Sequence, residues 1–284
     1  MQDKLVALVT GANKGIGLQI AKDFAARGLT VLVGSRKLAQ GETAAQGIGA
    51  AAHAIQIDVT DQASIAAAAE RIRREFGRLD VLVKNAGIAD SGGPGRSSTE
   101  IAASNTPSLA SLDEVRAVFE TNVFGVIATT QALLPLLREA PAGRIVNAGS
   151  SSGSLTLNAD PTYPHRAVFG AAYSPSKTAL HAITLAFASE LASTNIRVNA
   201  ACPGFTATDL NHFRGTLHHR TGRTCGRPPR AHRCGRTNRH VVGRGWPGPV
   251  VILSRVQERR EHRPPHPGPP ALTTRRRRHR DLPW

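Results

Sequence analysis

The stretch KLVALVTGANKGIG, residues 4–17, joins an apolar run to a turn that holds three glycines. The run predicts a buried strand, because parallel strands covered on both faces read as nearly continuous apolar sequence. The glycines have the spacing G-x-x-x-G-x-G and lead into a helical pattern. Such glycines let the backbone approach a pyrophosphate, and the start of the helix supplies N–H donors and a partial positive charge. A tight turn also needs glycine on its own account, so the rest of the chain must decide whether a dinucleotide binds here.

The remainder of the first 215 residues alternates apolar runs with amphipathic ones. Further strands are expected at 30–34, 54–57, 81–84, 144–148 and 196–200. Helical patterns lie between them at 15–27, 61–76, about 111–138 and 175–192. Gly28 and Gly77 stand where a C-terminal helix cap prefers glycine. This alternation predicts right-handed β-α-β units and an α/β fold with a doubly wound, Rossmann-type parallel sheet.

Two long stretches are expected to be loops. Residues 88–110 are rich in Gly, Ser and Pro, and residues 153–172 carry turn residues and two prolines. Both follow expected strands at their carboxyl ends, which is the edge where open α/β sheets bind ligands. The sequence therefore places the functional site at this edge.

The end of the second expected strand bears on the choice of cofactor. It reads GSRK at 34–37 and holds no acidic residue. Folds that bind NAD usually place an acid near this point, where it accepts from the ribose hydroxyls. A basic residue such as Arg36 suits the 2′-phosphate of NADP instead, and Lys14 in the glycine turn can join it. The sequence thus favours NADP(H), with NAD(H) still possible, although Arg36 and Lys37 also fit a solvated helix start.

The segment AAYSPSKTAL, residues 171–180, places Tyr173 four residues before Lys177. A helix can begin at Pro175, because proline at the first helical position has no N–H to lose. Tyr173 and Lys177 can then project toward one side of the helix mouth. An ammonium beside a phenol favours the phenolate and lowers the pKa of the phenol. The pair predicts a proton donor near neutral pH, whereas a plain helix start with a snorkelling lysine is the simpler alternative.

From Lys4 to about Leu210 these motifs and several others, in the same order, resemble the short-chain dehydrogenase/reductase family, and the glycine turn resembles that of its carbonyl reductases. Asp58 and Val59 resemble the pair that contacts adenine, and the segment 203–208 resembles the one that holds the nicotinamide carboxamide. The resemblance implies that the cofactor is bound by Gly11, Asn13, Lys14, Gly15, Ile16, Gly17, Arg36, Asp58, Val59, Asn85, Ala86, Gly87, Tyr173, Lys177, Pro203, Gly204, Phe205 and Thr208.

The resemblance also implies a catalytic set, formed by Asn122, Ser150, Tyr173 and Lys177. A hydride passes between the nicotinamide and a substrate carbonyl carbon, while Tyr173 gives the oxygen its proton and Ser150 holds that oxygen. Lys177 lowers the pKa of the tyrosine and binds the nicotinamide ribose, and Asn122 anchors a water. The expected function is reduction of a ketone or aldehyde, or the reverse. The alternative is a cofactor-binding sensor or scaffold without chemistry.

Two departures from the family pattern concern this region, and the place of the second tyrosine is open. Lys84 replaces the first asparagine of the motif Asn-Asn-Ala-Gly. The separation between Ser150 and Tyr173 is longer than is usual in the family, and four serines crowd at 150–154, of which the offset Ser-x-x-Gly favours Ser150. The second tyrosine, Tyr163, either lines the substrate cleft or lies on the surface.

The C-terminal part differs in composition from everything before it. Residues 1–215 hold 19 Lys and Arg against 17 Asp and Glu, a balance of +2. Residues 216–284 hold 17 Arg, no Lys and 3 acids, a balance of +14, together with 10 of the 18 prolines. Such a segment is expected to be disordered. The domains are thus expected at 1–215, a catalytic Rossmann-type domain, and at 216–284, a basic tail.

This tail stands where the family has a covering helix and a last parallel strand, so both are expected to be missing. Its arginines without lysine are typical of a GC-rich gene read in a shifted frame. Arginine runs can also bind nucleic acid, which the absence of a recognisable module disfavours. A zinc site is disfavoured because the spacing fits no common finger; its ligands would be Cys225, His232, Cys234 and His240. No metal is expected.

Bulk properties agree with one domain of moderate size. The chain has 284 residues and three cysteines, which are too few for a disulfide framework. The N-terminus enters a strand at once, without the pattern of a signal peptide, and no apolar stretch approaches a membrane span. A cytoplasmic protein with a small-molecule substrate and no membrane partner is expected. The family is usually homo-oligomeric, but assembly is doubtful for a chain with an incomplete sheet.

Overall fold

A computed structural model of the chain describes residues 4–91, 105–211, 213, 217–218 and 251–252. Its central sheet has the strand order β3-β2-β1-β4-β5-β6-β9, in which the first six strands are parallel. Their bounds are β1 Val6–Val9, β2 Thr30–Ser35, β3 Ala52–Gln56, β4 Val81–Lys84, β5 Arg144–Ala148 and β6 Arg197–Cys202. These strands confirm the doubly wound fold and lie within two residues of the expected bounds.

The order reverses between β1 and β4, which lie side by side although two strands and three helices separate them in sequence. The register pairs Ala7 with Val31 of β2 on one side and with Val81 of β4 on the other. At such a switch point the connections leave in opposite directions and open a crevice at the carboxyl edge of the sheet. The fold therefore sets the place where a ligand binds.

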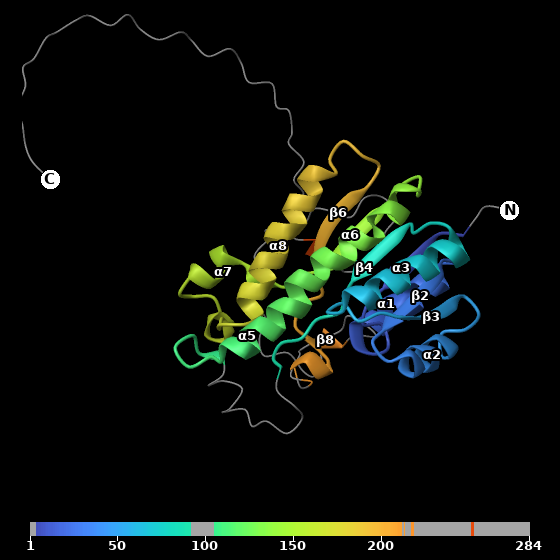
Figure 1. Cartoon of the computed structure of the whole chain (residues 1–284). Helices are drawn as coiled ribbons and strands as arrows, with labels where there is room; N and C mark the ends of the chain where they lie inside the picture. The colour runs from blue at the N-terminus through green and yellow to red at the C-terminus, as the bar shows by residue number, and fades with distance from the viewer. Residues whose placement is uncertain (1–3, 92–104, 212, 214–216, 219–250, 253–284) are drawn as a thin grey trace, which may run out of the picture.

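Helices cover both faces of the sheet (Figure 1). On one face α1 (Gly15–Ala26) and α2 (Leu38–Gln46) pack on alternate residues of β1 and β2. On the other face α3 (Gln62–Phe76), α6 (Gly125–Arg138) and the end of α8 (Tyr173–Glu190) pack on the residues between. Strands buried on both faces need apolar side chains at every position, which explains the continuous apolar runs.

Helix ends follow the expected signals, with one difference. Gly28 and Gly77 have φ of 85° and 74°, as glycines after a helix do. α3 begins after Asp61, whose carboxylate accepts from two backbone N–H groups of the first turn. α8 begins at Tyr173, two residues before the expected start, so Pro175 lies inside the first turn rather than at its first position. Proline is tolerated there because first-turn N–H groups have no partner within the helix. α2 was not expected.

The run 112–138 is one continuous helix with an interruption. α5 (Leu112–Phe119) passes through the π-helical turn η1 (Glu120–Phe124) into α6. By length and composition alone this run could cross a membrane, with a mean hydropathy of 1.3 in its most apolar window. Half of that window is buried inside the fold, where α6 packs against α3 and the sheet, so the run is a core helix.

The two expected loops have different outcomes. Residues 92–104 of the first lie outside the described residues. The second is partly helical, with the short turn η2 (Ser151–Gly153), the helix α7 (Leu155–Ala159) and the turn η3 (Arg166–Val168). Expecting only a loop there was wrong, because side chains cap the short elements: the Ser154 hydroxyl accepts from the Leu157 N–H at the start of α7.

Beyond β6 the chain leaves the regular pattern. β7 (Thr206–Ala207) pairs with β8 (Leu217–His218), and the turn η4 (Asp209–Asn211) lies between them. Among the described residues, the outer edge of β6 pairs with the two residues of β9 (Val251–Ile252), which run antiparallel. Among the described residues no parallel strand lies outside β6, where the family's last strand was expected to be missing. The remainder of the tail, and with it its expected disorder, lies outside the described residues.

Candidate active site

The glycine turn lies between β1 and α1 at the carboxyl edge of the sheet. Gly11 and Gly15 have φ of 63° and 58°, a conformation that favours glycine. A Cβ on Gly17 would lie 2.5 Å from both the Gly11 carbonyl oxygen and the Asn85 amide nitrogen. Lys14 at the start of α1 provides no side-chain cap, so first-turn N–H groups can serve a ligand, with Ile16 half-buried in that turn. This cradle fits the pyrophosphate of a dinucleotide.

Asn85 and Thr10 tie the ends of β4 and β1 together beside this turn. The Asn85 side-chain amide donates to the carbonyl oxygens of Thr10 and Gly11, each at 3.1 Å. The Thr10 hydroxyl accepts from the backbone N–H of Asn85 at 3.1 Å and of Ala86 at 3.0 Å. Sequence analysis selected Asn85 and Ala86 but missed Thr10, whose only signal was its place directly before the first glycine.

The basic residues of the expected phosphate site lie at the same edge. Arg36 is exposed at the end of β2. The Lys14 ammonium forms an ion pair with the Asp209 carboxylate at 3.1 Å, and the two side chains are 64% and 52% exposed. An exposed pair of this kind contributes about 0–1 kcal/mol, so an incoming phosphate can replace the carboxylate. Asn13 donates to Gln40 of α2 at 3.1 Å, which joins the turn to α2.

Asp58 and Val59, which the sequence assigned to the adenine contact, follow β3. The Asp58 carboxylate accepts from the N–H and the hydroxyl of Thr60 at 3.0 and 2.7 Å. Val59 is buried against Gly125, where a Cβ would lie 2.6 Å from the Val59 carbonyl oxygen. These contacts hold Asp58 and Val59 in place at the end of β3.

The segment 203–208 faces the glycine turn. Pro203 and Gly204 follow β6, and Gly204 has φ of 76°. A Cβ on Gly15 would lie 3.6 Å from the Thr208 methyl, so this segment packs against the start of α1. Phe205 is 46% exposed. The glycine turn therefore lies under the segment that follows β6.

Tyr173, the first residue of α8, contacts the serine turn that follows β5. Ser150 is near enough to the phenol to act on its pKa. The Ser150 hydroxyl oxygen lies 2.7 Å from that of Ser152 and accepts from the Ser152 N–H at 3.2 Å. The contact with the phenol belongs to Ser150, the serine that the offset to Gly153 favoured.

The pKa values of Tyr173 and Lys177 depart from their ordinary values in opposite directions. Burial, with a smaller contribution from Cys202, raises the pKa of Tyr173 to about 12, although the neighbouring Ser150 acts to lower it. Burial lowers the pKa of Lys177 to about 8. The Lys177 ammonium lies 5.5 Å from the centre of the Tyr173 ring and donates to the Ala148 carbonyl oxygen at 2.8 Å. The pKa of the tyrosine is therefore shifted upward, opposite to the expected lowering, because burial of the phenol is the largest cause.

Asn122 lies in the π-helical turn η1 and is 1% exposed. Its amide nitrogen donates to the Ile88 carbonyl oxygen at 2.9 Å and to the Ser176 hydroxyl at 3.0 Å, and its amide oxygen accepts from the Ile88 N–H at 3.0 Å. A Cβ on Gly87 would lie 3.0 Å from that oxygen and 3.7 Å from the Lys177 ammonium. Asn122 thus braces the end of β4 against α8 beside Lys177, through Ser176, which sequence analysis missed. Its role in holding a water stays a prediction.

Lys84 points away from this cluster into the core. It is 3% exposed, and its ammonium donates to the Val126 carbonyl oxygen at 3.4 Å and to the Thr130 hydroxyl. The ammonium also lies 5.6 Å from the centre of the Phe187 ring. Burial lowers the pKa of Lys84 to about 7. The residue that departs from the family motif therefore joins β4 to α6 and α8.

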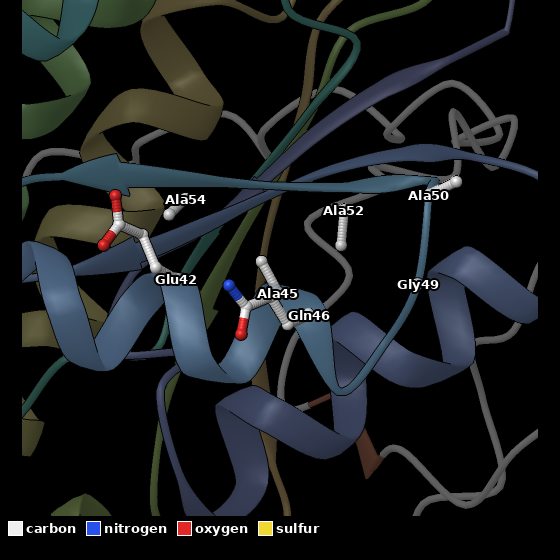
Figure 2. Close-up of a pocket in the computed structure, with 7 residues that line it drawn as sticks. All are labelled: Glu42, Ala45, Gln46, Gly49, Ala50, Ala52 and Ala54. Carbon is white, nitrogen blue, oxygen red and sulfur yellow. The ribbon is translucent and has the colours of Figure 1, made fainter.

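Two surface hollows lie apart from these residues. Figure 2 shows one between α2 and β3, whose lining is mostly alanine and glycine with Glu42 and Gln46. It contains no predicted site residue and carries no function here. The second hollow is lined by the 153–172 segment and includes Tyr163. The Tyr163 hydroxyl donates to the Ser151 hydroxyl at 3.5 Å, and His165 lies between the rings of Tyr163 and Phe205, with centroids 5.6 and 6.1 Å away.

No group of three or more His, Cys, Asp or Glu side chains that could hold a metal occurs among the residues that the structure describes. The four residues considered for zinc lie outside them.

Comparison with known proteins identifies the class to which this fold and this site belong. The family model for short chain dehydrogenases matches residues 5–216, and the chain belongs to this family. The match ends at the residue where the arginine-rich composition begins. The chain is therefore an oxidoreductase of a family that binds nicotinamide cofactors and acts on small molecules, and the last residues lie outside the family domain.

Individual reductases are similar to this chain over most of its length. The 3-oxoacyl-(acyl-carrier-protein) reductase of Escherichia coli is 34% identical over 209 residues, which cover 72% of this chain and 75% of the relative. The (-)-isopiperitenone reductase of Mentha piperita is 34% identical over 275 residues, with 74% and 87% covered. The crystal structure of 3-ketoacyl-(acyl-carrier-protein) reductase from Brucella melitensis complexed with NADH is 31% identical, with a TM-score of 0.61, and the match covers 75% of this chain and 80% of that one.

Proposed function

We propose that this chain is an NADP(H)-dependent carbonyl reductase, which converts a ketone or aldehyde to an alcohol or catalyses the reverse reaction. The observation that carries the proposal is the placement of the buried Tyr173 phenol next to Ser150, with the ammonium of Lys177 5.5 Å from the centre of the tyrosine ring. A phenol and a hydroxyl that lie next to each other can hold and protonate a carbonyl oxygen. Relatives that are named as reductases support the same type of chemistry.

The chain's own residues would act on the carbonyl oxygen in the following way. The bound nicotinamide supplies or removes a hydride at the carbonyl carbon. Tyr173 donates its phenolic proton to the oxygen, and the Ser150 hydroxyl donates a hydrogen bond to the same atom. The Lys177 ammonium stabilises the negative charge that develops on the phenol oxygen. Asn122 holds the end of β4 beside Lys177 through its hydrogen bond with Ser176.

The cofactor proposal rests on charge at the end of β2. Arg36 is exposed there without an acid among residues 34–37, and Lys14 forms an exposed ion pair with Asp209. Both suit the 2′-phosphate of NADP, which a bidentate arginine binds well. Because one similar reductase is complexed with NADH, the chain can also accept NAD(H) with lower affinity.

The proposal also covers the extent of the catalytic domain, the class of substrate, the location of the protein and its assembly. The catalytic domain ends near residue 215, and the tail has no part in the chemistry. The substrate is a small carbonyl compound or alcohol, the protein works in the cytoplasm, and the tail is not a nucleic-acid-binding element. Oligomers of the family's usual kind do not form with an incomplete sheet.

The experiment is a comparison of binding with turnover. The full chain is titrated with NADPH and NADH by fluorescence, and a panel of ketones and aldehydes is then tested by loss of NADPH absorbance. A reductase binds NADPH more tightly than NADH and turns over at least one carbonyl. A sensor or scaffold binds NADPH without turnover of any member of the panel, and that result would overturn the proposed function.

A further inference from the structure

A histidine lies directly beneath the serine turn, at a place that the proposed chemistry does not use. His181 stands on α8 one turn after Lys177, and the Ser150 backbone N–H donates to its Nε2 at 3.4 Å. This contact is long for a hydrogen bond, but the fit around it is close. A Cβ on Gly149 would lie 2.7 Å from Nε2 and 3.3 Å from Cδ2 of the imidazole. The Nε2–Cδ2 edge of the imidazole therefore packs closely against the backbone that leads into Ser150.

The geometry requires one protonation state of His181. To accept from the Ser150 N–H, Nε2 must carry a lone pair, so the ring is neutral and its proton is on Nδ1. A protonated ring has donors on both nitrogens, and it would place an N–H against the N–H of Ser150. The serine turn would lose its support and shift away from α8.

Its surroundings keep the ring neutral. Burial and the nearby Lys177 ammonium lower the pKa of His181 below its ordinary value of 6.5. Among the described residues, the other titratable groups of this cluster are Tyr173 on α8 and Cys202 at the end of β6, and the end of β5 contributes only the backbone around Gly149 and Ser150. No carboxylate within the described part of the chain shifts the pKa of His181.

We propose that His181 is a positioning residue, whose neutral imidazole holds the end of β5 so that the Ser150 hydroxyl reaches the Tyr173 phenol. The inference rests on the proposed function, because it concerns the residue that would hold the carbonyl oxygen. Two variants separate the hydrogen-bond acceptor of His181 from its ability to titrate. His181→Gln can retain an acceptor toward Ser150 and does not titrate, whereas His181→Leu keeps an apolar side chain of similar reach and removes the acceptor.

The first measurement does not depend on catalysis. The full chain is labelled with ¹⁵N-serine, and the Ser150 amide resonance, assigned by its loss in Ser150→Ala, is followed from about pH 8 to about pH 5. We expect it to titrate below pH 6.5 in the parent and in the control His53→Gln, a histidine on β3 that packs against Phe76. We expect no titration in His181→Gln. A Ser150 resonance that ignores pH in the parent, or titrates equally in His181→Gln, would overturn the inference.

The second measurement uses turnover. Carbonyl reduction by the parent should fall as the pH drops through the pKa of His181, and His181→Gln should lose this acid limb. His181→Leu should lower kcat by roughly tenfold or more with an unchanged KM for NADPH, since misplacing a catalytic group is costly. An acid limb that persists in His181→Gln would count against the inference. A parent that turns over no carbonyl refutes the proposed function instead, and the Ser150 resonance still decides the contact.

Discussion

At the scale of single residues, burial disfavours the charged form of a side chain. It therefore raises the pKa of an acid and lowers the pKa of a base. It raises the pKa of Tyr173 to about 12 and lowers the pKa of Lys177 to about 8. Tyr173 is thus fully protonated throughout the neutral range, as a proton donor must be. The neighbouring ammonium keeps its charge only below about pH 8, so its help to the phenolate fades in alkaline solution.

The charge at the end of β2 predicts the effect of Arg36→Asp. A carboxylate there repels the 2′-phosphate and accepts from a free 2′-hydroxyl, so preference should move from NADPH toward NADH. The expected loss of NADPH affinity is on the order of tenfold or more, because hydrogen bonds to charged groups contribute about 1.5–3 kcal/mol. Fluorescence titration with both cofactors measures it, and Lys37→Asp is the neighbouring control. Equal NADPH affinity in the parent and in the double variant Lys14→Ala, Arg36→Ala would refute this assignment.

Lys84 predicts a pH dependence of stability. Its folded-state pKa of about 7 lies below the ordinary lysine pKa of 10.5. Between these values the unfolded chain binds more protons, so the free energy of unfolding rises with pH, and below about pH 7 the contribution is constant. Lys84→Met should remove about 1 kcal/mol per pH unit of this slope. Lys177 adds a slope of the same sign above about pH 8, so the comparison is between parent and variant.

Urea unfolding at two pH values within this window provides the measurement. Lys22→Met, at an exposed lysine of α1, should leave the slope unchanged. A slope in Lys84→Met identical to that of the parent would show that the folded chain keeps Lys84 charged.

At the scale of elements, the glycine turn can be tested by one methyl group. Gly17→Ala places a Cβ against the Gly11 carbonyl and the Asn85 amide, at 2.5 Å from each. The turn must then open, which should weaken NADPH binding by at least an order of magnitude and destabilise the fold by about 1–3 kcal/mol. Gly47→Ala is the matched control, because its Cβ meets nothing closer than 3.5 Å. Thermal unfolding and NADPH titration of Gly17→Ala that match the parent would contradict the packing described here.

Elements with strong patterns could be predicted from the sequence, and weak or interrupted ones could not. The six parallel strands are buried on both faces, so their apolar runs mark them clearly. α2 contains Gly41 and carries only a weak apolar face, and the short helix α7 lies in a segment broken by prolines. Both depend on packing against the rest of the fold, which no local pattern records.

The candidate site divides in the same way. Tyr173 and Lys177 carry a spacing that a reader of the sequence can recognise. Thr10, Ser176 and His181 act through contacts with residues 31 to 76 positions away, and they have no local signal. The raised pKa of Tyr173 also depends on burial, which the spacing of two residues cannot show.

At the scale of the whole molecule, the chain has two parts that meet at one residue. The family match ends at 216, where arginine without lysine begins, and β6 is left with the two residues of β9 at its outer edge. We propose that the tail comes from a shifted reading frame. Resequencing the gene should reveal the shift and restore a sequence with the family's last strand and helix. An uninterrupted frame across all 284 codons would overturn this proposal.

The central claim is that Tyr173 is the proton donor of a carbonyl reductase, and Tyr173→Phe tests it most directly. The variant keeps the ring and its packing and removes only the hydroxyl. We expect kcat for carbonyl reduction to fall by about 10²–10⁴-fold, the range for general acid catalysis, while the Kd for NADPH stays within about threefold of the parent value. Tyr163→Phe, at the other tyrosine, is the control and should retain turnover. Reduction of carbonyl substrates by Tyr173→Phe at the rate of the parent would contradict the account.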